Sequence, residues 1–329
     1  MTMPNTPTAA PAITATGLSK SYGDKKVLDG IDLHIPEGTI FALLGPNGAG
    51  KTTTVQILST LISANAGQAR IAGHDLTGEV DAVRGAIGVT GQFAAVDNLL
   101  TAHENLMLMS DLQHLSRRDG RRRSAELLRR FELTDAAKRP VTTFSGGMRR
   151  KLDLAMTLVG DPRIIFLDEP TTGLDPRSRR TMWEIIRGLV ADEGVTIFLT
   201  TQYLEEADQL ADRIAVLDHG KLVAEGTADE LKRLIPGGHI RLRFGDANGL
   251  ETAADLFGSA ARDSEELTLQ IPSDGSIPTL RAVLDVLDNA SVKAESLTVH
   301  TPDLDDVFLT LTGQAQSGAG TNSQLENAR

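Results

Sequence analysis

Apolar and polar residues alternate from Ile13 to Ile35, on both sides of a turn at Gly23 and Asp24. A period of two residues places the apolar side chains on one face of a strand, so this stretch predicts antiparallel strands. A short apolar run, Thr39 to Leu44, leads through a glycine-rich turn into a helical pattern from Lys51 to about Ile62. The beginning of the chain therefore predicts a small antiparallel layer followed by strand, loop and helix.

The middle of the chain has a helical pattern. Between about Phe93 and Gly160, leucine, methionine and alanine recur at helical spacing, as in Leu127, Leu128 and Phe131. Three later apolar runs have the length of buried strands and are separated by helix-like segments: Arg163 to Leu167, Val195 to Thr200 and Arg213 to Leu217. Strands that alternate with helices predict a parallel α/β sheet, and the helical stretch is inserted into it.

Changes in composition divide the chain into segments. The predicted α/β domain covers residues 13–235, and its helical subdomain covers about 93–160. Residues 236–313 contain two alternating stretches and one helical stretch, which predict a small C-terminal α+β domain. Residues 1–12 and 314–329 are dominated by small, polar and proline residues, so we expect a disordered leader and a disordered tail.

Charge and hydropathy exclude several classes of protein. The formal net charge of -11 opposes a nucleic-acid partner, which needs a concentrated basic face. The chain has no cysteine, so disulfides and thiolate metal sites are excluded. No stretch approaches the roughly 18 consecutive apolar residues that span a bilayer, and the first residues lack the pattern of a signal peptide. We therefore expect a protein that stays inside the cell and does not itself insert into a membrane.

The segment GPNGAGKTT, residues 45–53, matches the phosphate-loop pattern G-x-x-x-x-G-K-[ST] between a predicted strand and a predicted helix. Its glycines let backbone N–H groups turn toward phosphate oxygens at a helix N-terminus. Lys51 can neutralise the β- and γ-phosphates, and the Thr52 hydroxyl can bind Mg²⁺. The loop residues predicted to contact the nucleotide are Gly45, Pro46, Asn47, Gly48, Ala49, Gly50, Lys51, Thr52 and Thr53.

Two acids end the predicted strand in RIIFLDEP, residues 163–170. Asp168 at the strand end can hold Mg²⁺ through water, and Glu169 can accept a proton from an attacking water molecule. A single acid after a strand would be weak evidence, but tandem acids that follow a phosphate loop predict hydrolysis of a nucleoside triphosphate.

The segment FSGGM, residues 144–148, resembles the signature motif of ABC ATPases, which commonly begins Leu-Ser-Gly-Gly. Ser145 is a plausible helix N-cap, and Gly146 and Gly147 leave the helix N-terminus open to an anion. Alone, these residues also suit an ordinary helix start. The resemblance implies that the anion is the γ-phosphate of ATP on the opposite protomer, and hence a head-to-tail dimer with a second, identical ATPase subunit.

Other motifs of this family follow in order along residues 13–235. The resemblance implies that Tyr22 stacks on adenine and that Gln92 contacts Mg²⁺ and links the nucleotide site to the helical subdomain. Asp175, in Gly-Leu-Asp, matches the D-loop at the dimer interface. The implied fold is a P-loop NTPase core with an antiparallel β subdomain and a helical subdomain, and the implied ligands are ATP and Mg²⁺. The seven histidines have no metal-site spacing, so no other metal is expected.

The chain departs from the family pattern at Gln202. After the strand Thr196 to Thr200 the family usually has a switch histidine that contacts the γ-phosphate. An amide can still donate a hydrogen bond, but it does not titrate near neutrality as imidazole does. We expect Gln202 to take the catalytic position of that histidine, with slower or differently gated hydrolysis. Lys51, Asp168 and Glu169 argue against an inactive site.

Two further segments closely resemble the ATP-binding subunits of daunorubicin/doxorubicin-resistance exporters: TTQYLEEADQLADRIAVLDHGKLVAEGT and PDLDDVFLTLTG. This resemblance implies drug or antibiotic efflux, with a separate transmembrane permease that docks on the helical subdomain. It also implies a peripheral position on the cytoplasmic side of the cell membrane. The alternatives are an exporter of a lipid, a glycan precursor or a peptide, and a non-transport ABC ATPase. The tandem motors and long coiled coils of the latter are lacking.

Two segments keep open interpretations. The basic run RRDGRRR, residues 117–123, can face anionic lipid or an acidic loop of the permease, or form an ordinary solvated helix end. Near the C-terminus, Leu304, Val307, Phe308 and Leu311 share one face of a predicted short helix. That face suits ordinary packing, a regulatory contact or stabilisation of the dimer.

Overall fold

The computed structural model describes residues 11–235, 238–258, 260–300 and 302–317. The chain divides into two compact units between Ala228 and Asp229. This division lies before the boundary expected after residue 235, because the short helix α8 (Ala228–Lys232) groups with the second unit. None of the helices in the described ranges is long and apolar enough to cross a membrane.

The first unit begins with an antiparallel sheet of order β2-β1-β4-β5. Its strands are β1 (Pro11–Tyr22), β2 (Lys25–Pro36), β4 (Ala66–Ile71) and β5 (His74–Asp75). Strand β1 starts before the end expected for the disordered leader, because Pro11 pairs with Pro36 and Ala12 is 1% exposed. The rest of that leader, residues 1–10, lies outside the described residues. The hairpin of β1 and β2 confirms the predicted antiparallel layer.

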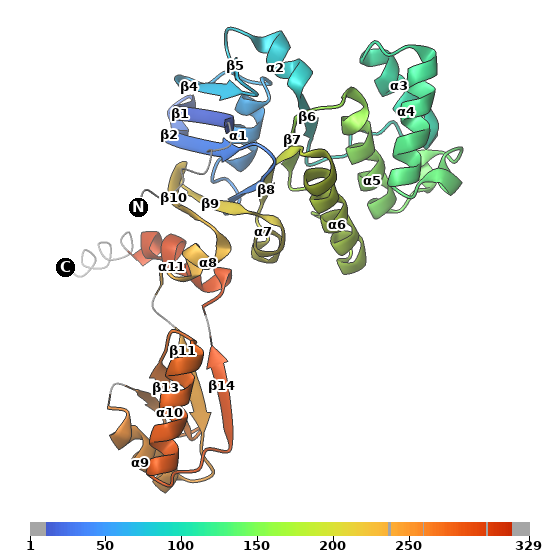
Figure 1. Cartoon of the computed structure of the whole chain (residues 1–329). Coiled ribbons are helices and arrows are strands. Elements are labelled where there is room, and N and C mark those ends of the chain that lie inside the picture. The colour runs from blue at the N-terminus through green and yellow to red at the C-terminus, as the bar shows by residue number, and fades with distance from the viewer. Residues whose placement is uncertain (1–10, 236–237, 259, 301, 318–329) are drawn as a thin grey trace, which may run out of the picture. The chain divides into compact units, whose positions relative to one another are not determined.

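A second sheet, of order β10-β9-β3-β8-β7-β6, forms the centre of the first unit (Figure 1). All neighbouring strands are parallel except β10, which is antiparallel to β9. Every residue of β3, β7 and β8 is buried, and continuous apolar runs are typical of such doubly covered strands. The strands are β3 (Ile40–Leu44), β6 (Ile87–Thr90), β7 (Ile164–Asp168), β8 (Thr196–Thr201), β9 (Arg213–Asp218) and β10 (Lys221–Gly226). The predicted parallel α/β sheet is confirmed.

Four helices connect these strands within the first unit: α1 (Lys51–Leu58), α2 (Val80–Ala86), α6 (Pro176–Glu193) and α7 (Leu204–Leu210). Helix α1 ends earlier than the predicted Ile62, because Thr60 has a left-handed backbone with φ of 64°. The rings of Phe41 and Phe166 each lie 5.6 Å from the ring of Phe198. Since β3, β7 and β8 run parallel, the residues that follow them meet at one edge of the sheet.

Helices between β6 and β7 form the predicted insertion, on the opposite side of the central sheet from the antiparallel strands (Figure 1). They are α3 (Ala102–Leu112), α4 (Arg117–Arg130) and α5 (Gly146–Thr157), with short 3-10 turns at 134–136, 141–143 and 158–160. Thr101 and Glu104 close a capping box at the start of α3. Leu106, Leu127 and Phe131 are fully buried, so the insertion has apolar packing of its own.

The second unit contains a sheet of order β12-β13-β11-β14 and has the β-α-β-β-α-β arrangement of ferredoxin-like domains. Its elements are β11 (His239–Arg243), α9 (Ala247–Leu256), β12 (Ala261–Asp263), β13 (Thr268–Pro272), α10 (Ile277–Asn289) and β14 (Ser296–His300). Ile240 and Leu269 pack in one cluster with Leu250 of α9 and Val283 of α10. The two helices therefore cover the apolar face of this sheet.

The helix α11 (Leu304–Ser317) follows β14. It buries Leu304 and Val307, two members of the apolar face predicted for this segment. Residues 314–317 belong to this helix, which therefore ends after the expected start of the disordered tail. The remainder of that tail, residues 318–329, lies outside the described residues.

Candidate active site

The loop between β3 and α1 has the backbone that its glycines predict. Gly48 and Gly50 have φ of 83° and 115°, in the left-handed region that favours glycine. A Cβ atom on Gly45 would lie 2.3 Å from the carbonyl oxygen of Leu217, and one on Gly50 would lie 2.9 Å from that of Val27. No side chain caps α1. The helix N-terminus therefore offers its N–H groups to an anion.

Lys51, the first residue of α1, lies buried beneath this loop and is 5% exposed. Its Nζ donates hydrogen bonds to the carbonyl oxygens of Gly45 and Pro46, at 2.8 and 3.2 Å, and lies 3.6 Å from Glu169 Oε1. Burial lowers the pKa of Lys51, while the charges of Glu169 and Asp168 act in the opposite direction. An incoming phosphate would favour the charged amine, since opposite charges attract strongly where water is excluded.

Asp168 ends β7 and is 4% exposed. Its Oδ1 accepts hydrogen bonds from the hydroxyl of Thr52, at 3.2 Å, and from the hydroxyl of Thr200, at 2.6 Å. Thr52 and Asp168 thus place hydroxyl and carboxylate oxygens side by side, which are ligands that suit Mg²⁺. The described residues contain no cluster of three or more His, Asp or Glu that could hold a metal. A two-residue site fits Mg²⁺, because this ion keeps several waters and takes substrate phosphates as ligands.

Glu169 has a left-handed backbone, with φ of 48°, which is uncommon for a residue with a Cβ atom. Its N–H donates to both the carbonyl and the hydroxyl oxygen of Thr200, each at 3.1 Å, and these bonds hold the strained turn. The carboxyl Oε2 accepts from Thr172 Oγ1 at 3.2 Å and from Gln92 Nε2 at 3.4 Å. The structure therefore brings Gln92 to Glu169, which also contacts Lys51, although Gln92 comes from a different segment.

The glycine motif and Asp175 form a second group of residues. Ser145 caps α5 by accepting a hydrogen bond from the N–H of Met148, at 3.2 Å, as its sequence predicts. Asp175 caps α6 in the same way and accepts from the N–H of Ser178 at 3.0 Å. A Cβ atom on Gly147 would lie 2.7 Å from Ser178 Oγ, so the starts of α5 and α6 are adjacent. In the described ranges, no hydrogen bond or ion pair links this group to the phosphate loop.

Tyr22 and Gln202 are two other residues predicted to contact the nucleotide. Tyr22, at the end of β1, is 51% exposed, and the Nζ of Lys20 lies 5.3 Å from its ring centroid. Gln202 follows β8, in a turn closed by a 2.9 Å hydrogen bond from the N–H of Tyr203 to Thr201 Oγ1. Within the described part of the chain, neither Tyr22 nor Gln202 forms a hydrogen bond with loop residues 45–53. Their predicted contacts with adenine and the γ-phosphate stay predictions.

The similarity of this chain to known proteins identifies its family. A family model described as ABC transporter matches residues 28–172. The daunorubicin resistance ATP-binding protein DrrA3 of Streptomyces coeruleorubidus is 49% identical over 304 residues, which cover 92% of this chain and 96% of the relative. The chain belongs to the ATP-binding proteins of ABC transporters. The predicted family, the P-loop fold and the ATPase activity are thereby confirmed.

The ABC ATPase is also similar to a more distant relative and to a solved structure. The Nod factor export ATP-binding protein I of Ralstonia nicotianae is 35% identical over 319 residues, 93% of this chain and 95% of the relative. A dimeric ATP-binding cassette solved in a post-hydrolysis state with ADP and phosphate is 27% identical, with a TM-score of 0.60. The match covers 98% of that cassette but 65% of this chain. The ABC ATPase therefore contains a C-terminal region beyond the match to the solved cassette.

Arg150, which no sequence motif singled out, is a buried side chain of this ABC ATPase at 7% exposure. Its guanidinium donates to the carbonyl oxygens of Gly91, at 2.7 Å, and Pro170, at 2.8 Å, and pairs with Asp153 at 3.2 Å. Burial lowers the pKa of Arg150, and the charge of Asp153 acts in the opposite direction. Arg150 thereby joins α5 to the segment before Gln92 and to the loop after β7. Arg150 lies one turn into the helix that follows the glycine motif, and this position is the sequence signal that could have identified it.

The basic run at residues 117–123 forms the start of α4. Arg122 pairs with Asp119 at 3.1 Å, and Arg123 pairs with Glu126 at 3.1 Å and donates to the carbonyl oxygen of Leu158 at 2.8 Å. Part of the run therefore supports packing within the ABC ATPase, between α4 and the turn that leads to β7.

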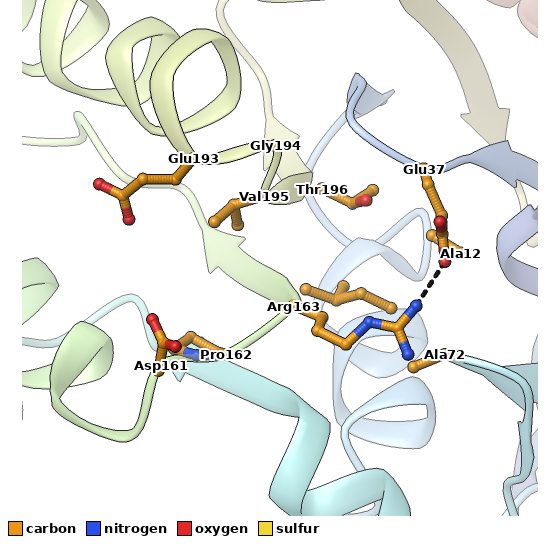
Figure 2. A pocket seen from close by; sticks show the side chains of 11 residues that line it. Ala12, Glu37, Ala72, Asp161, Pro162, Arg163, Glu193, Gly194, Val195 and Thr196 are labelled. Carbon is orange, nitrogen blue, oxygen red and sulfur yellow. Dashed lines mark hydrogen bonds and ion pairs between the residues drawn. The ribbon is translucent and has the colours of Figure 1, made fainter. Parts of the chain in front are cut away.

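A cavity of about 400 Å³ lies at the opposite edge of the central sheet (Figure 2). Arg163 and Glu37 pair across it at 2.6 Å, and they are 58% and 42% exposed. Val195 and Thr196 also line it, at the beginning of β8. None of the residues predicted to bind ATP lines this cavity.

Proposed function

We propose that this chain is the ATP-hydrolysing motor of a drug or antibiotic exporter. One observation carries the proposed chemistry: Lys51, Thr52, Asp168, Glu169 and Gln92 converge at the carboxyl ends of β3, β6 and β7. This edge is where open parallel sheets bind their ligands. Drug efflux rests on the 49% identity to the daunorubicin resistance protein.

The residues have distinct proposed roles in the reaction. Lys51 leaves the carbonyl oxygens of Gly45 and Pro46 and binds the β- and γ-phosphates, while Thr52 and Asp168 hold Mg²⁺. Bound Mg²⁺ neutralises charge that develops on the phosphate oxygens. Glu169 accepts the proton of the attacking water and is itself oriented by Thr172 and Gln92, which donate to its Oε2.

A second, identical subunit completes the site in this proposal. Ser145, Gly146 and Gly147 present the N-terminus of α5, and Asp175 begins the adjacent α6. One surface of the subunit therefore carries both motifs. The similar solved cassette is a dimer, which supports a head-to-tail pair in which this surface faces the ATP of the partner subunit. Tyr22 would hold adenine and Gln202 the γ-phosphate.

The proposed permease docks on the helical insertion, at the cytoplasmic side of the cell membrane. Phe93 directly follows Gln92 and is 86% exposed, as is Leu99 six residues further on. Large apolar side chains exposed together mark contact surfaces. A permease segment bound there would move with the helices and with Gln92, so that ATP binding and hydrolysis at the acids change its position.

The partner can be identified by purifying the tagged chain with ATP from gently solubilised native membranes and analysing bound proteins by mass spectrometry. We expect a polytopic membrane protein in stoichiometric amount. If the chain is recovered only from the soluble fraction, with ribosomes or with no partner, the exporter function is wrong and a non-transport ATPase becomes the leading hypothesis.

The cargo can be tested in cells that express this motor with that permease. We expect wild-type cells to retain less daunorubicin than cells in which Glu169 is replaced by Gln. Equal retention, with active ATP hydrolysis, would exclude this drug. The relative named for Nod factor export indicates that similar motors serve exporters of other cargoes. A lipid, a glycan precursor or a peptide would then be tested with the same pair of strains.

A further inference from the structure

A buried carboxyl group outside the phosphate site has no role in the reaction described above. Glu206 lies in the first turn of α7 and is 0% exposed. Its Oε1 accepts hydrogen bonds from the hydroxyl of Thr171, at 2.8 Å, and from the indole Nε1 of Trp183, at 3.0 Å. Its Oε2 is buried and has no hydrogen-bond partner within 3.5 Å among the described residues, although the nearby Thr201 hydroxyl acts to lower the pKa of this carboxyl group. Burial of such a group is costly, so ordinary packing gives no reason for a glutamate here.

The three residues of this carboxyl bridge, Glu206, Thr171 and Trp183, belong to three separate segments. Thr171 follows Glu169 by two residues, in the loop that leads to Asp175. Trp183 lies in α6, the helix that Asp175 caps. Glu206 follows Gln202 by about one helical turn. The bridge therefore connects the turn at Gln202 with the two segments that carry Glu169 and Asp175.

We propose that Glu206 is a positioning residue that makes the turn at Gln202 move as one body with the loop after Glu169 and with α6. The proposal rests on the role proposed for Gln202 at the γ-phosphate. The backbone at Gln202 is held on one side by the hydrogen bond from Tyr203 N–H to Thr201 Oγ1 and on the other by α7. A displacement of Gln202 by the γ-phosphate is thus transmitted through the carboxyl bridge to the start of α6.

The bridge uses a single oxygen atom, which decides the choice of variants. The amide oxygen of glutamine can accept the same two hydrogen bonds, so Glu206→Gln preserves the bridge. Glu206→Leu has a similar volume but no acceptor, and it leaves the Thr171 hydroxyl and the Trp183 N–H unpaired. Glu205→Leu is the matched control, because the adjacent Glu205 is 65% exposed and its nearest cation, Arg179, is 3.9 Å away.

Trp183 is the single tryptophan of the chain and donates directly to Glu206, so its fluorescence reports on the bridge. The full-length protein would be titrated with Mg-ATP. We expect the emission of Trp183 to change on binding in the wild type, Glu206→Gln and Glu205→Leu. In Glu206→Leu we expect ATP still to bind, measured by displacement of a fluorescent nucleotide, but the emission change to disappear. An unaltered emission change in Glu206→Leu would overturn the proposal.

Turnover gives a second readout. We expect the kcat for ATP of Glu206→Leu to fall by about tenfold while KM stays within about twofold, and Glu206→Gln to keep nearly the wild-type kcat. A purely structural role predicts loss of folded protein instead of a selective loss of kcat. Equal kcat in wild type and Glu206→Leu, or loss of kcat in Glu206→Gln as large as in Glu206→Leu, would contradict positioning by this oxygen.

Thr171→Val provides an independent test where Glu206→Leu does not fold. It removes one donor of the carboxyl bridge but preserves side-chain shape, and we expect a fall in kcat of about threefold with KM within about twofold, together with a smaller emission change of Trp183 on binding of Mg-ATP. Wild-type kcat and an unaltered emission change in Thr171→Val would count against the bridge. Gln202→Ala tests the role of Gln202 separately. If Gln202 has no role at the γ-phosphate, this variant keeps the wild-type kcat. The emission of Trp183 still reports whether the bridge transmits nucleotide binding.

Discussion

The two edges of the central sheet differ in what their charged residues do. At the carboxyl edge, Lys51 and Glu169 have side chains that are 5% and 8% exposed, and each is held by polar groups from other segments. At the amino edge, the cavity of about 400 Å³ contains Arg163 and Glu37, which pair with each other and are 58% and 42% exposed (Figure 2). Electrostatic interactions are stronger where water is excluded, so charged side chains of the same types interact more strongly at the carboxyl edge.

The difference shows that the presence of a cavity does not by itself locate the chemistry of this protein. Arg163 and Glu37 satisfy each other near water, where an ion pair contributes little free energy. Lys51, Asp168 and Glu169 form a charged group that leaves one helix N-terminus open beside them. Convergent buried charges therefore identify the site better than the volume of the opening does.

The strongest test of this comparison exchanges one carboxylate for an amide at each edge. We expect Glu169→Gln to lower steady-state ATP turnover by at least about a hundredfold, because a general base contributes roughly 10²–10⁴ to the rate. Nucleotide binding should be retained, and the dimer should be trapped with ATP. The matched variant Glu37→Gln should change turnover by less than about twofold. ATPase and nucleotide-binding assays measure both, and normal hydrolysis by Glu169→Gln would remove Glu169 from the role of base.

A second test compares arginines at the two edges through the free energy of unfolding. Arg150→Met should destabilise the protein by about 3 kcal/mol, because it leaves Asp153 buried without its cation. Arg163→Met should cost less than about 0.5 kcal/mol, since its ion pair is exposed. Urea denaturation measures both changes. Equal losses of stability would mean that burial does not separate the two edges.

Much of the carboxyl edge could be predicted from the sequence because its signals are local. Residues 44–53 contain the strand end, the glycines and the helix start within one short segment, and Asp168 and Glu169 stand at the end of their strand and directly after it. The hydrogen-bond partners of Ser145 and Asp175, at the starts of α5 and α6, are also only three residues away. Local patterns of this kind hold in most tertiary contexts.

Other residues of the site could not be predicted, because their roles depend on segments far apart in the chain. Arg149 and Arg150 are adjacent and chemically identical, and only packing of α5 against Gly91 and Pro170 decides which one is buried. The same holds for Glu205 and Glu206, of which the fold buries the second. Thr200 has no motif of its own, although it contacts both acids.

A smaller effect is expected at Gln202, where a titrating group can be added to the carboxyl edge. Gln202→His should give ATP turnover that is a few-fold higher below the imidazole pKa of about 6.5 than above it, because the protonated ring adds a positive charge beside the γ-phosphate. The wild type and Gln202→Asn should lack this inflection, since amides do not titrate. Rates measured from about pH 6 to pH 8 test it. A pH profile that His does not alter would place residue 202 away from the phosphate.

The smallest expected effect concerns stability as a function of pH. Burial raises the pKa of Glu206, while the hydroxyls of Thr201 and Thr171 and the Trp183 N–H oppose the rise. Because the folded chain then holds this proton more tightly than the unfolded chain, the stabilising contribution is complete below the unfolded pKa and is lost as the pH rises through the folded pKa.

Glu206→Gln removes the titration of this carboxyl group. Its free energy of unfolding should therefore improve relative to the wild type as the pH rises from 4.5, the ordinary value for a glutamate, toward neutrality. Glu205→Gln, at a side chain that is 65% exposed, should follow the wild-type curve. If the Glu206→Gln and wild-type curves stay parallel, Glu206 has the same proton affinity in both states, and the contrast between buried and exposed charges does not extend to this carboxyl group.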